Sequence, residues 1–241
     1  MKKILMTLLF SAFVAPMAFA YVAPKTKHPE PIYARIKVHC TQLPKVGQID
    51  VSDADNNTRS RWSVGTEGLD RKYATFSKYK EYLGPLGVGW SRFQSGWARC
   101  EQKKGVYDFA WLDEAVDGII AQGVKPWLSL SYGNPLYCGG GISLKSAIWT
   151  DEPTMKAWRN YVRAIVRHFG DRVTAYEVWN EPDGQKANTP AIMAELLINT
   201  AEVVRKENPK AMIYALGLAA PNCAYIKEVL DILKSRGKLH L

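Results

Sequence analysis

The chain has 241 residues, of which 47% are hydrophobic, and its 32 lysines and arginines outnumber its 23 aspartates and glutamates to give a formal charge of +9. This length favours one domain with a single sizeable core. The basic residues are dispersed and no nucleic-acid motif occurs, so they indicate a solvated surface and argue against a nucleic-acid partner.

The first 20 residues have the layout of a secretory signal peptide. Two lysines precede an apolar run from Ile4 to Val14, and Ala18-Phe19-Ala20 is a small-residue cleavage site before Tyr21. The run is shorter than the roughly 20 residues that a membrane-spanning helix needs, and no other segment approaches that length. We therefore expect an exported protein, periplasmic or extracellular, without a membrane span. The sequence leaves its oligomeric state open.

Residues 21–61 predict an irregular N-terminal arm that is rich in proline and polar residues. The spacing of Asp53, Asp55 and Asn57 is like that of a calcium loop. However, position six is Thr58 instead of glycine and position twelve is Val64 instead of glutamate. Histidine and cysteine spacing gives no zinc pattern either. The sequence therefore predicts neither a metal nor another cofactor.

From residue 62 to residue 241, strand patterns alternate with helix patterns. Glycine and proline punctuate the alternation. Asp151 or Thr150 is expected to cap the start of one helix and Thr189 that of another, and Gly123 and Gly170 are expected to end two of the helices. Strands are predicted at 62–66, 88–93, 124–132, 173–183 and 211–216, and helices at 71–83, 109–122, 154–169, 189–206 and 222–235, with 237–241 as the apparent start of a sixth strand.

Five strand–helix units in strict alternation predict an α/β fold with parallel strands and right-handed crossovers. Two architectures fit: a doubly wound open sheet, or a TIM-type (β/α)8 barrel that is incomplete, with only its first five units present. The first strand leads into Gly65-Thr66-Glu67-Gly68, which lacks the glycine spacing of a nucleotide-binding loop. This absence disfavours an open-sheet nucleotide or sugar-phosphate binder, and a sixth strand would favour the interrupted barrel.

The most informative stretch is the fourth strand, which delivers a carboxylate. Its β-branched and aromatic residues predict a buried strand, and Pro182 stops the hydrogen-bond ladder directly after Glu181. In α/β barrels and open α/β sheets, the carboxyl ends of the strands are where ligands bind and where chemistry occurs. Structural alternatives are Glu181 as a helix-entry residue and Asn180 as a turn former.

The motif Tyr-Glu-Val-Trp-Asn-Glu-Pro at 176–182 resembles the fourth strand of the large (β/α)8 clan of retaining glycoside hydrolases, which includes endoglucanase-like and xylosidase/iduronidase-like families. The segments 90–97 with 105–113, and 124–135, resemble the second strand with its helix and the third strand of that clan. The resemblance covers about residues 62–241. It implies a glycosidase acting on an oligo- or polysaccharide, in which one carboxylic acid protonates the leaving oxygen and a second carboxylate attacks the sugar.

The resemblance also implies roles for individual residues. Glu181 matches the general acid/base, and Asn180 matches the asparagine that binds the sugar 2-hydroxyl. Arg92 matches an arginine that supports the nucleophile, although an ion pair with Glu177 inside the barrel is an equal alternative. Trp97, Tyr132 and Asn134 follow the second and third strands, where rings could stack on sugars and an amide could bind hydroxyls; packing is at least as good an explanation for each.

The clan's nucleophile is a glutamate on a seventh strand, which this sequence does not contain. Glu67 and Asp183 are the nearest substitutes, but neither matches that position. We therefore expect a chain that lacks the nucleophile-bearing part and has little activity alone. The alternative is a non-catalytic carbohydrate-binding or scaffold protein on a barrel remnant.

The cysteines leave three disulfide pairings open, since an exported chain can form disulfides. The four candidates are Cys40, Cys100, Cys138 and Cys223. Cys100 and Cys138 follow consecutive predicted strands, so their loops could meet if those strands are neighbours.

Overall fold

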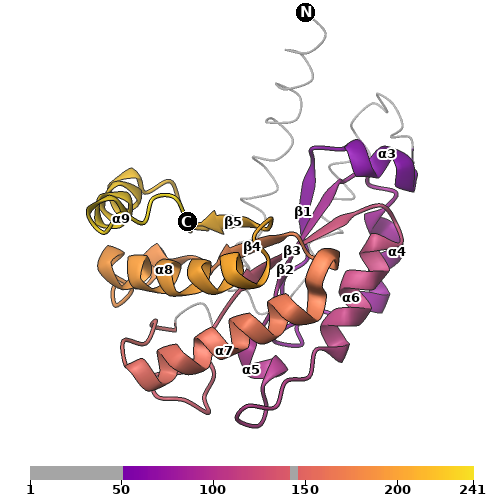
Figure 1. Ribbon diagram of the computed structural model, residues 1–241. Helices are drawn as coiled ribbons and strands as arrows, with labels where there is room; N and C mark the ends of the chain where they lie inside the picture. The colour runs from indigo at the N-terminus through magenta and orange to yellow at the C-terminus, as the bar shows by residue number, and fades with distance from the viewer. Residues whose placement is uncertain (1–50, 142–145) are drawn as a thin grey trace, which may run out of the picture. The chain divides into compact units, whose positions relative to one another are not determined.

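A computed structural model describes residues 51–141 and 146–241, and a compact unit runs from Val51 to Leu241. The predicted signal peptide and the arm up to residue 50, with Cys40, lie outside the described residues. Within the unit, strands and helices alternate along the chain (Figure 1).

The five predicted strands are all present and form one parallel sheet. Each strand pairs with the next strand in the chain, so the order is β1-β2-β3-β4-β5. A doubly wound sheet would reverse its strand order at a switch point, so this order favours the barrel. The strands are β1 (Ser63–Gly65), β2 (Trp90–Gln94), β3 (Lys125–Leu130), β4 (Ala175–Val178) and β5 (Met212–Ala215).

The helices follow the strands as predicted, and the three-turn or longer ones begin and end at the expected signals. Asp151 and Thr189 cap two of them through their side chains, and Gly123 takes a positive φ of 72° after a third. The α-helices are α3 (Ala54–Arg59), α4 (Lys80–Leu83), α5 (Trp97–Cys100), α6 (Ala110–Ile120), α7 (Glu152–Phe169), α8 (Pro190–Glu207) and α9 (Cys223–Ser235), and the short 3-10 helices are η1 (Phe76–Lys78), η2 (Gly170–Arg172) and η3 (Pro182–Gly184).

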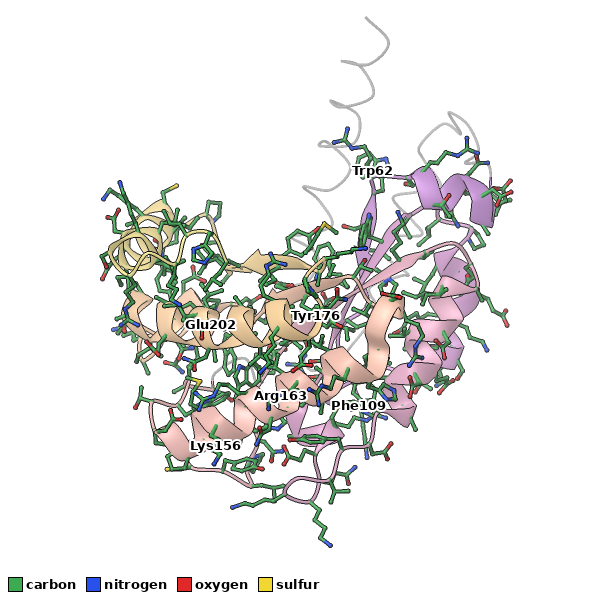
Figure 2. All side chains as sticks on the ribbon, in the orientation of Figure 1. Trp62, Phe109, Lys156, Arg163, Tyr176 and Glu202 are labelled. Atoms are coloured by element: carbon green, nitrogen blue, oxygen red, sulfur yellow. The ribbon has the colours of Figure 1, made fainter. Side chains whose placement is uncertain are left out.

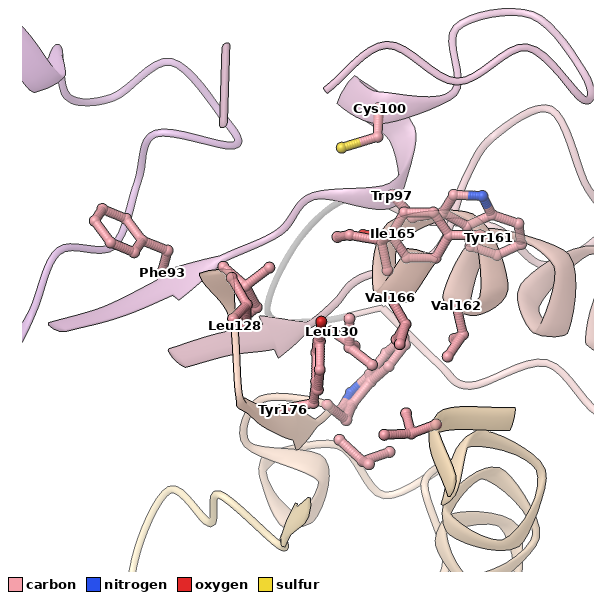
Figure 3. Close-up of a cluster of buried hydrophobic side chains, with 14 of the residues drawn as sticks. Phe93, Trp97, Cys100, Leu128, Leu130, Tyr161, Val162, Ile165, Val166 and Tyr176 are labelled. Carbon is pink, nitrogen blue, oxygen red and sulfur yellow. The ribbon is translucent and has the colours of Figure 1, made fainter. Parts of the chain in front are cut away.

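The main core lies between the sheet and the helices that cover one of its faces. Tyr176 of β4 and Leu128 of β3 point from the sheet toward this core, where α7 contributes Ile165 and Val166 (Figure 3). These four side chains are almost fully buried. Full burial of an aliphatic side chain of this size stabilises the fold by about 1.5–3 kcal/mol. The apolar face of each strand therefore determines which face of the sheet packs against the helices.

Three predictions about local structure were wrong. Residues 54–59, expected to be irregular, form helix α3, because Asp53 accepts a hydrogen bond from the Asn56 amide at 2.8 Å. The buried side chain of Asn57 donates to the carbonyls of Gly84 and Gln122, both at 2.9 Å. These contacts tie α3 into the compact unit, and Asn57 serves a structural purpose there.

The helix predicted over 71–83 is reduced to η1 and α4. Lys72 has a φ of 61°, and the amides of Tyr73 and Ala74 both donate to the Gly68 carbonyl, so a turn replaces the first helical residues. The segment 237–241 forms a turn and not a sixth strand. There the Lys238 amide donates to Leu233 at 2.8 Å, which folds the chain back on α9.

The edges of the sheet expose large side chains. Met212 and Tyr214 of β5 are 41% and 38% exposed. Trp62, just before β1, is 73% exposed (Figure 2). Unpaired, apolar sheet edges promote association between chains. No helix in the described ranges is long and apolar enough to cross a membrane.

Candidate active site

The backbone after β4 turns sharply and carries Glu181 beyond the end of the sheet. β4 stops at Val178, earlier than predicted, and Trp179 and Glu181 take left-handed φ values of 66° and 51°. The Trp179 amide donates to Leu130 at 3.0 Å, and the Glu181 amide donates to Gly217 at 2.7 Å. Left-handed conformations cost non-glycine residues about 1–3 kcal/mol each and cluster at functional sites. The neighbouring strands therefore hold Glu181 in place.

Asn180 is buried, and both ends of its amide are bound by protein groups. Its Oδ1 accepts a hydrogen bond from Arg92 Nη2 at 2.8 Å, and its Nδ2 donates to the Tyr132 hydroxyl at 2.8 Å. Two neighbouring strands thus fix the orientation of the amide. One N–H of Nδ2 and one lone pair of Oδ1 remain for another partner.

Arg92 connects the ends of four strands. Its Nε donates to Glu177 at 2.6 Å and its Nη1 to Glu67 at 2.8 Å, while Nη2 also reaches Ser129 at 3.2 Å. The ion pair with Glu177, one of two alternatives drawn from the sequence, is confirmed. Burial alone would lower the pKa of Arg92, but the hydrogen bonds and charges of Glu177 and Glu67 raise it above its ordinary value.

Tyr132 supports Asn180 from the end of β3. Its ring is buried and lies under the Arg71 guanidinium, whose carbon is 5.3 Å from the ring centroid. Its hydroxyl accepts from Gln94 at 3.2 Å as well as from Asn180. Burial raises the pKa of Tyr132 to about 12, so the phenol is neutral near pH 7. Tyr132 therefore contributes to the site mainly through its hydroxyl group, which binds Asn180, and not through its ring face.

Trp97 does not offer a ring face to a sugar, contrary to the prediction. Its side chain is fully buried at the start of α5 and stacks on Tyr161, with ring centroids 5.7 Å apart (Figure 3). It also stacks on Tyr137, with ring centroids 5.1 Å apart. Its indole N–H donates to Glu101. The loop after β2 turns inward here, and the packing alternative describes the residue.

Asn134 is likewise structural. It is almost fully buried, its Nδ2 donates to the Glu101 carbonyl at 2.8 Å, and its Oδ1 accepts from the Leu136 amide at 3.0 Å. The side chain therefore holds the loop after β3 and is not placed to bind substrate hydroxyls.

Comparison with known proteins identifies the family. The family model of glycosyl hydrolases family 39 matches residues 89–231, more than half of the chain. The chain belongs to glycosyl hydrolases family 39. This agrees with the clan that the fourth-strand motif resembles.

Solved structures similar to this family 39 chain share its fold. A family 39 glycoside hydrolase from Bacteroides cellulosilyticus superposes with a TM-score of 0.62 at 22% identity, over 77% of this chain and 37% of that one. A monomeric β-xylosidase from Caulobacter crescentus gives 0.56 at 23% identity, over 78% and 41%. Identities this low establish the fold alone, which is that of an incomplete (β/α)8 barrel.

A curated relative of this family 39 chain is β-glucosidase 47 of Arabidopsis thaliana, which is 27% identical over 150 residues, covering 54% of this chain and 27% of that protein. The family 39 chain thus spans well under half the length of the relatives and structures that it matches first.

Sequence reasoning missed several partners in the site of this family 39 protein. Ser129 and Trp127 of β3 contact Arg92 and Glu177, and the indole N–H of Trp127 donates to Glu177 at 3.1 Å. Register explains both contacts. Trp127 lies opposite Arg92 and Ser129 lies opposite Glu177, so all four side chains share one face of the sheet, and each hydrogen bond joins diagonal neighbours on adjacent strands. Only the strand order, combined with alternation of side chains, could have revealed them.

The two substitute acids have different surroundings. Glu67 is partly exposed and bound by Arg92, whereas Asp183 accepts a hydrogen bond from the Ala219 amide at 2.9 Å and stabilises a turn. Among the described residues, no cluster of three or more histidine, cysteine or acidic side chains is arranged to hold a metal ion.

Cysteine pairing between the loops after β2 and β3 does not occur. Cys100 is free and buried, with its thiol donating to the Ser95 carbonyl at 3.1 Å, and Cys138 is free and exposed. Cys223 is also free and exposed. The two strands are neighbours as expected, but Cys100 lies on the core side of its loop.

Proposed function

We propose that this family 39 chain supplies the acid/base half of a retaining glycoside hydrolase, with Glu181 as the general acid/base and an oligo- or polysaccharide as substrate. The observation that carries the proposal is the position of Glu181. It lies half-buried at the carboxyl end of the sheet beside the fixed amide of Asn180, and its carboxylate makes no hydrogen bond within the described part of the chain. A carboxyl group left free in this way is available to a leaving oxygen.

Asn180 would position the sugar. Arg92 and Tyr132 fix its amide, and the free N–H can bind a hydroxyl of the sugar next to the cleaved bond. Arg92 therefore acts as a positioning residue for Asn180 in this arrangement, while its ion pair with Glu177 keeps it rigid.

Hydrolysis with retention needs a second carboxylate about 5–5.5 Å from the first. We assign it to no described residue. Glu67 belongs to the same network, since it and Asn180 share Arg92, but it does not occupy the position of the clan's nucleophile. The expectation of low activity for residues 1–241 alone rests on this point.

The test is hydrolysis of aryl glycosides by the chain and by the product of the full reading frame that contains it, each compared with Glu181→Gln. General acid catalysis contributes about 10²–10⁴-fold, so the substitution should lower turnover of nitrophenyl glycosides by that factor. Dinitrophenyl glycosides need less protonation and should lose much less. Glu228→Gln changes an exposed glutamate on α9 and is the matched control. Equal losses in kcat/KM for the two substrates, which reports the step that expels the leaving group, would contradict the acid role.

A non-catalytic carbohydrate-binding protein is the second candidate, because the fixed amide of Asn180 can bind a sugar hydroxyl while no described residue is assigned as the nucleophile. It predicts saccharide binding without turnover by the full reading-frame product, and binding that Glu181→Gln leaves unchanged.

We also propose export to the periplasm or the medium. The support is the lysine pair, apolar run and Ala-Phe-Ala site of residues 1–20. Mass spectrometry of the protein from its natural host should find a mature N-terminus at Tyr21. A retained N-terminal methionine would contradict export by this route.

A further inference from the structure

The loop that carries Glu181 is held by the loop that follows β5. Two hydrogen bonds join the loops, and they run in opposite directions. The Glu181 amide donates to the Gly217 carbonyl at 2.7 Å, and Oδ1 of Asp183 accepts from the Ala219 amide at 2.9 Å. Residues 181 and 183 are thus tied to residues 217 and 219, and we call these two hydrogen bonds the β4–β5 clamp.

The backbone half of the β4–β5 clamp depends on the absence of a side chain at Gly217. A Cβ at this position would overlap Oε1 of Glu177, so only glycine lets the loop pass this close to the end of β4. Leu216 has a left-handed φ of 62°, which turns the chain directly after β5. The Gly217 carbonyl therefore faces the Glu181 amide, and Asp183 supplies the side-chain half of the clamp.

Glu181 needs such a clamp because of its backbone conformation. Its φ of 51° and ψ of 52° are left-handed. This conformation costs a non-glycine residue as much as or more than one backbone hydrogen bond contributes, and it persists only where the surrounding structure enforces it. The direction of the Glu181 side chain follows from these two angles, so a relaxed backbone would point the carboxyl group elsewhere.

The far end of the same loop is anchored independently of Asp183. The Tyr225 hydroxyl of α9 donates to the Asn188 carbonyl at 2.7 Å, and Oδ1 of Asn188 accepts from the Ile148 amide at 2.7 Å. Burial raises the pKa of Tyr225, and the nearby charge of Asp183 adds to the shift. Removing the Asp183 carboxylate should therefore free residues 181–183 locally and leave the rest of the loop in place.

We propose that Asp183 is a positioning residue for Glu181. Its carboxylate holds the Ala219 amide, and the β4–β5 clamp keeps the general acid/base in its left-handed conformation and pointed at the leaving oxygen. Asp183 acts through the backbone and does not touch the sugar. The inference rests on the proposed function for the acid role of Glu181, but the clamp can be measured without turnover.

Amide hydrogen exchange at Glu181 tests the β4–β5 clamp directly. Asp183→Ala removes the acceptor and should speed exchange of the Glu181 amide at least about tenfold, because the loop opens more often. Asp183→Asn keeps an oxygen that can accept from Ala219, and its exchange rate should stay within about threefold of the parent. The control is Asp53→Ala, which removes a 2.8 Å hydrogen bond of the same kind at α3 and should leave exchange at Glu181 unchanged.

Turnover by the product of the full reading frame tests the consequence for catalysis. A displacement on the order of 1 Å can cost about 10²-fold, so Asp183→Ala should lower kcat/KM for nitrophenyl glycosides by about 10- to 100-fold. Dinitrophenyl glycosides, which need less protonation, should lose less than about threefold. Asp183→Asn should recover most of the loss. Asp53→Ala should lower both values equally or not at all, because a general loss of stability does not distinguish the leaving groups.

Unchanged exchange at Glu181 in Asp183→Ala overturns the proposal. An equal loss for the two leaving groups does so too, as does a loss that Asp183→Asn fails to recover. If Asp183→Ala does not fold, Asp183→Leu takes its place, since leucine has a similar shape without an acceptor. A parent without turnover rejects the proposed function, and exchange then decides on the clamp. A parent with turnover whose Asp183 variants behave like Asp53→Ala rejects this inference only.

Discussion

Replacing Arg92 with methionine removes the centre of the site while keeping a side chain of similar length. The substitution leaves the Glu177 carboxylate buried, with the Trp127 indole as its remaining donor at 3.1 Å. It also removes the donor to Asn180 and frees Glu67. Breaking a buried ion pair by removing one partner costs about 3–5 kcal/mol, because the other charge stays buried without compensation.

That cost should be visible in equilibrium unfolding. In a domain of this size, each kcal/mol lowers the melting temperature by about 2–4 °C, so Arg92→Met should lower it by roughly 6–20 °C. Urea unfolding followed by the fluorescence of the eight tryptophans gives the free energy directly. The double variant Arg92→Met, Glu177→Met should recover most of the loss, since an apolar pair often matches a buried ion pair in stability.

The control is Lys227→Ala, which removes an exposed i,i+4 pair with Asp231 on α9. Exposed pairs contribute about 0–1 kcal/mol, so its effect should be small. If Arg92→Met costs no more than this control, or if the double variant is less stable than the single one, the ion pair is not the buried, coupled element described here.

Three further changes test other parts of the fold. Gly217→Ala places a Cβ against Oε1 of Glu177 and should lower the free energy of unfolding in urea by about 1–3 kcal/mol, because it displaces that carboxylate; an unchanged midpoint would contradict the close approach. Asp70→Asn should be more stable than the parent at neutral pH. Burial raises the pKa of the folded Asp70, so the difference in free energy of unfolding between the variant and the parent grows as pH rises through that raised pKa. The difference disappears below the unfolded pKa of 3.8, and a difference that grows in acid would contradict this prediction. Thr189→Ala removes the cap that accepts from the Ile192 amide and should cost about 0.5–2 kcal/mol, with no effect on saccharide binding.

Local signals predicted most of the backbone. Apolar runs bounded by glycine and proline placed the five strands, and caps such as Asp151 and Thr189 placed the long helices. The helix expected over 71–83 failed because the Gly68 carbonyl accepts from two amides in a turn, and no propensity or periodicity reports such a contact.

Side chains in the site were predictable where they lie on strands and not where they lie on loops. The Arg92–Glu177 pair was one of two readings for a strand residue, because alternation tells which residues share a face. Trp97 begins the short helix α5 and Asn134 lies in the loop after β3, where the direction of a side chain depends on hydrogen bonds such as those to Glu101.

The Arg92 network also ties the position of Glu181 to the register of the sheet. Side chains alternate strictly along a strand, so a slip of β4 by one residue would move Glu177 to the core face and Tyr176 toward Arg92. The slip would bury the charge of Glu177 in the apolar core. It would also break the hydrogen bond between Arg92 and Asn180. The side chains that fix the Asn180 amide next to Glu181 therefore also select the register of β4. The position of the proposed acid/base depends on contacts among four strands and not on the fourth-strand motif alone.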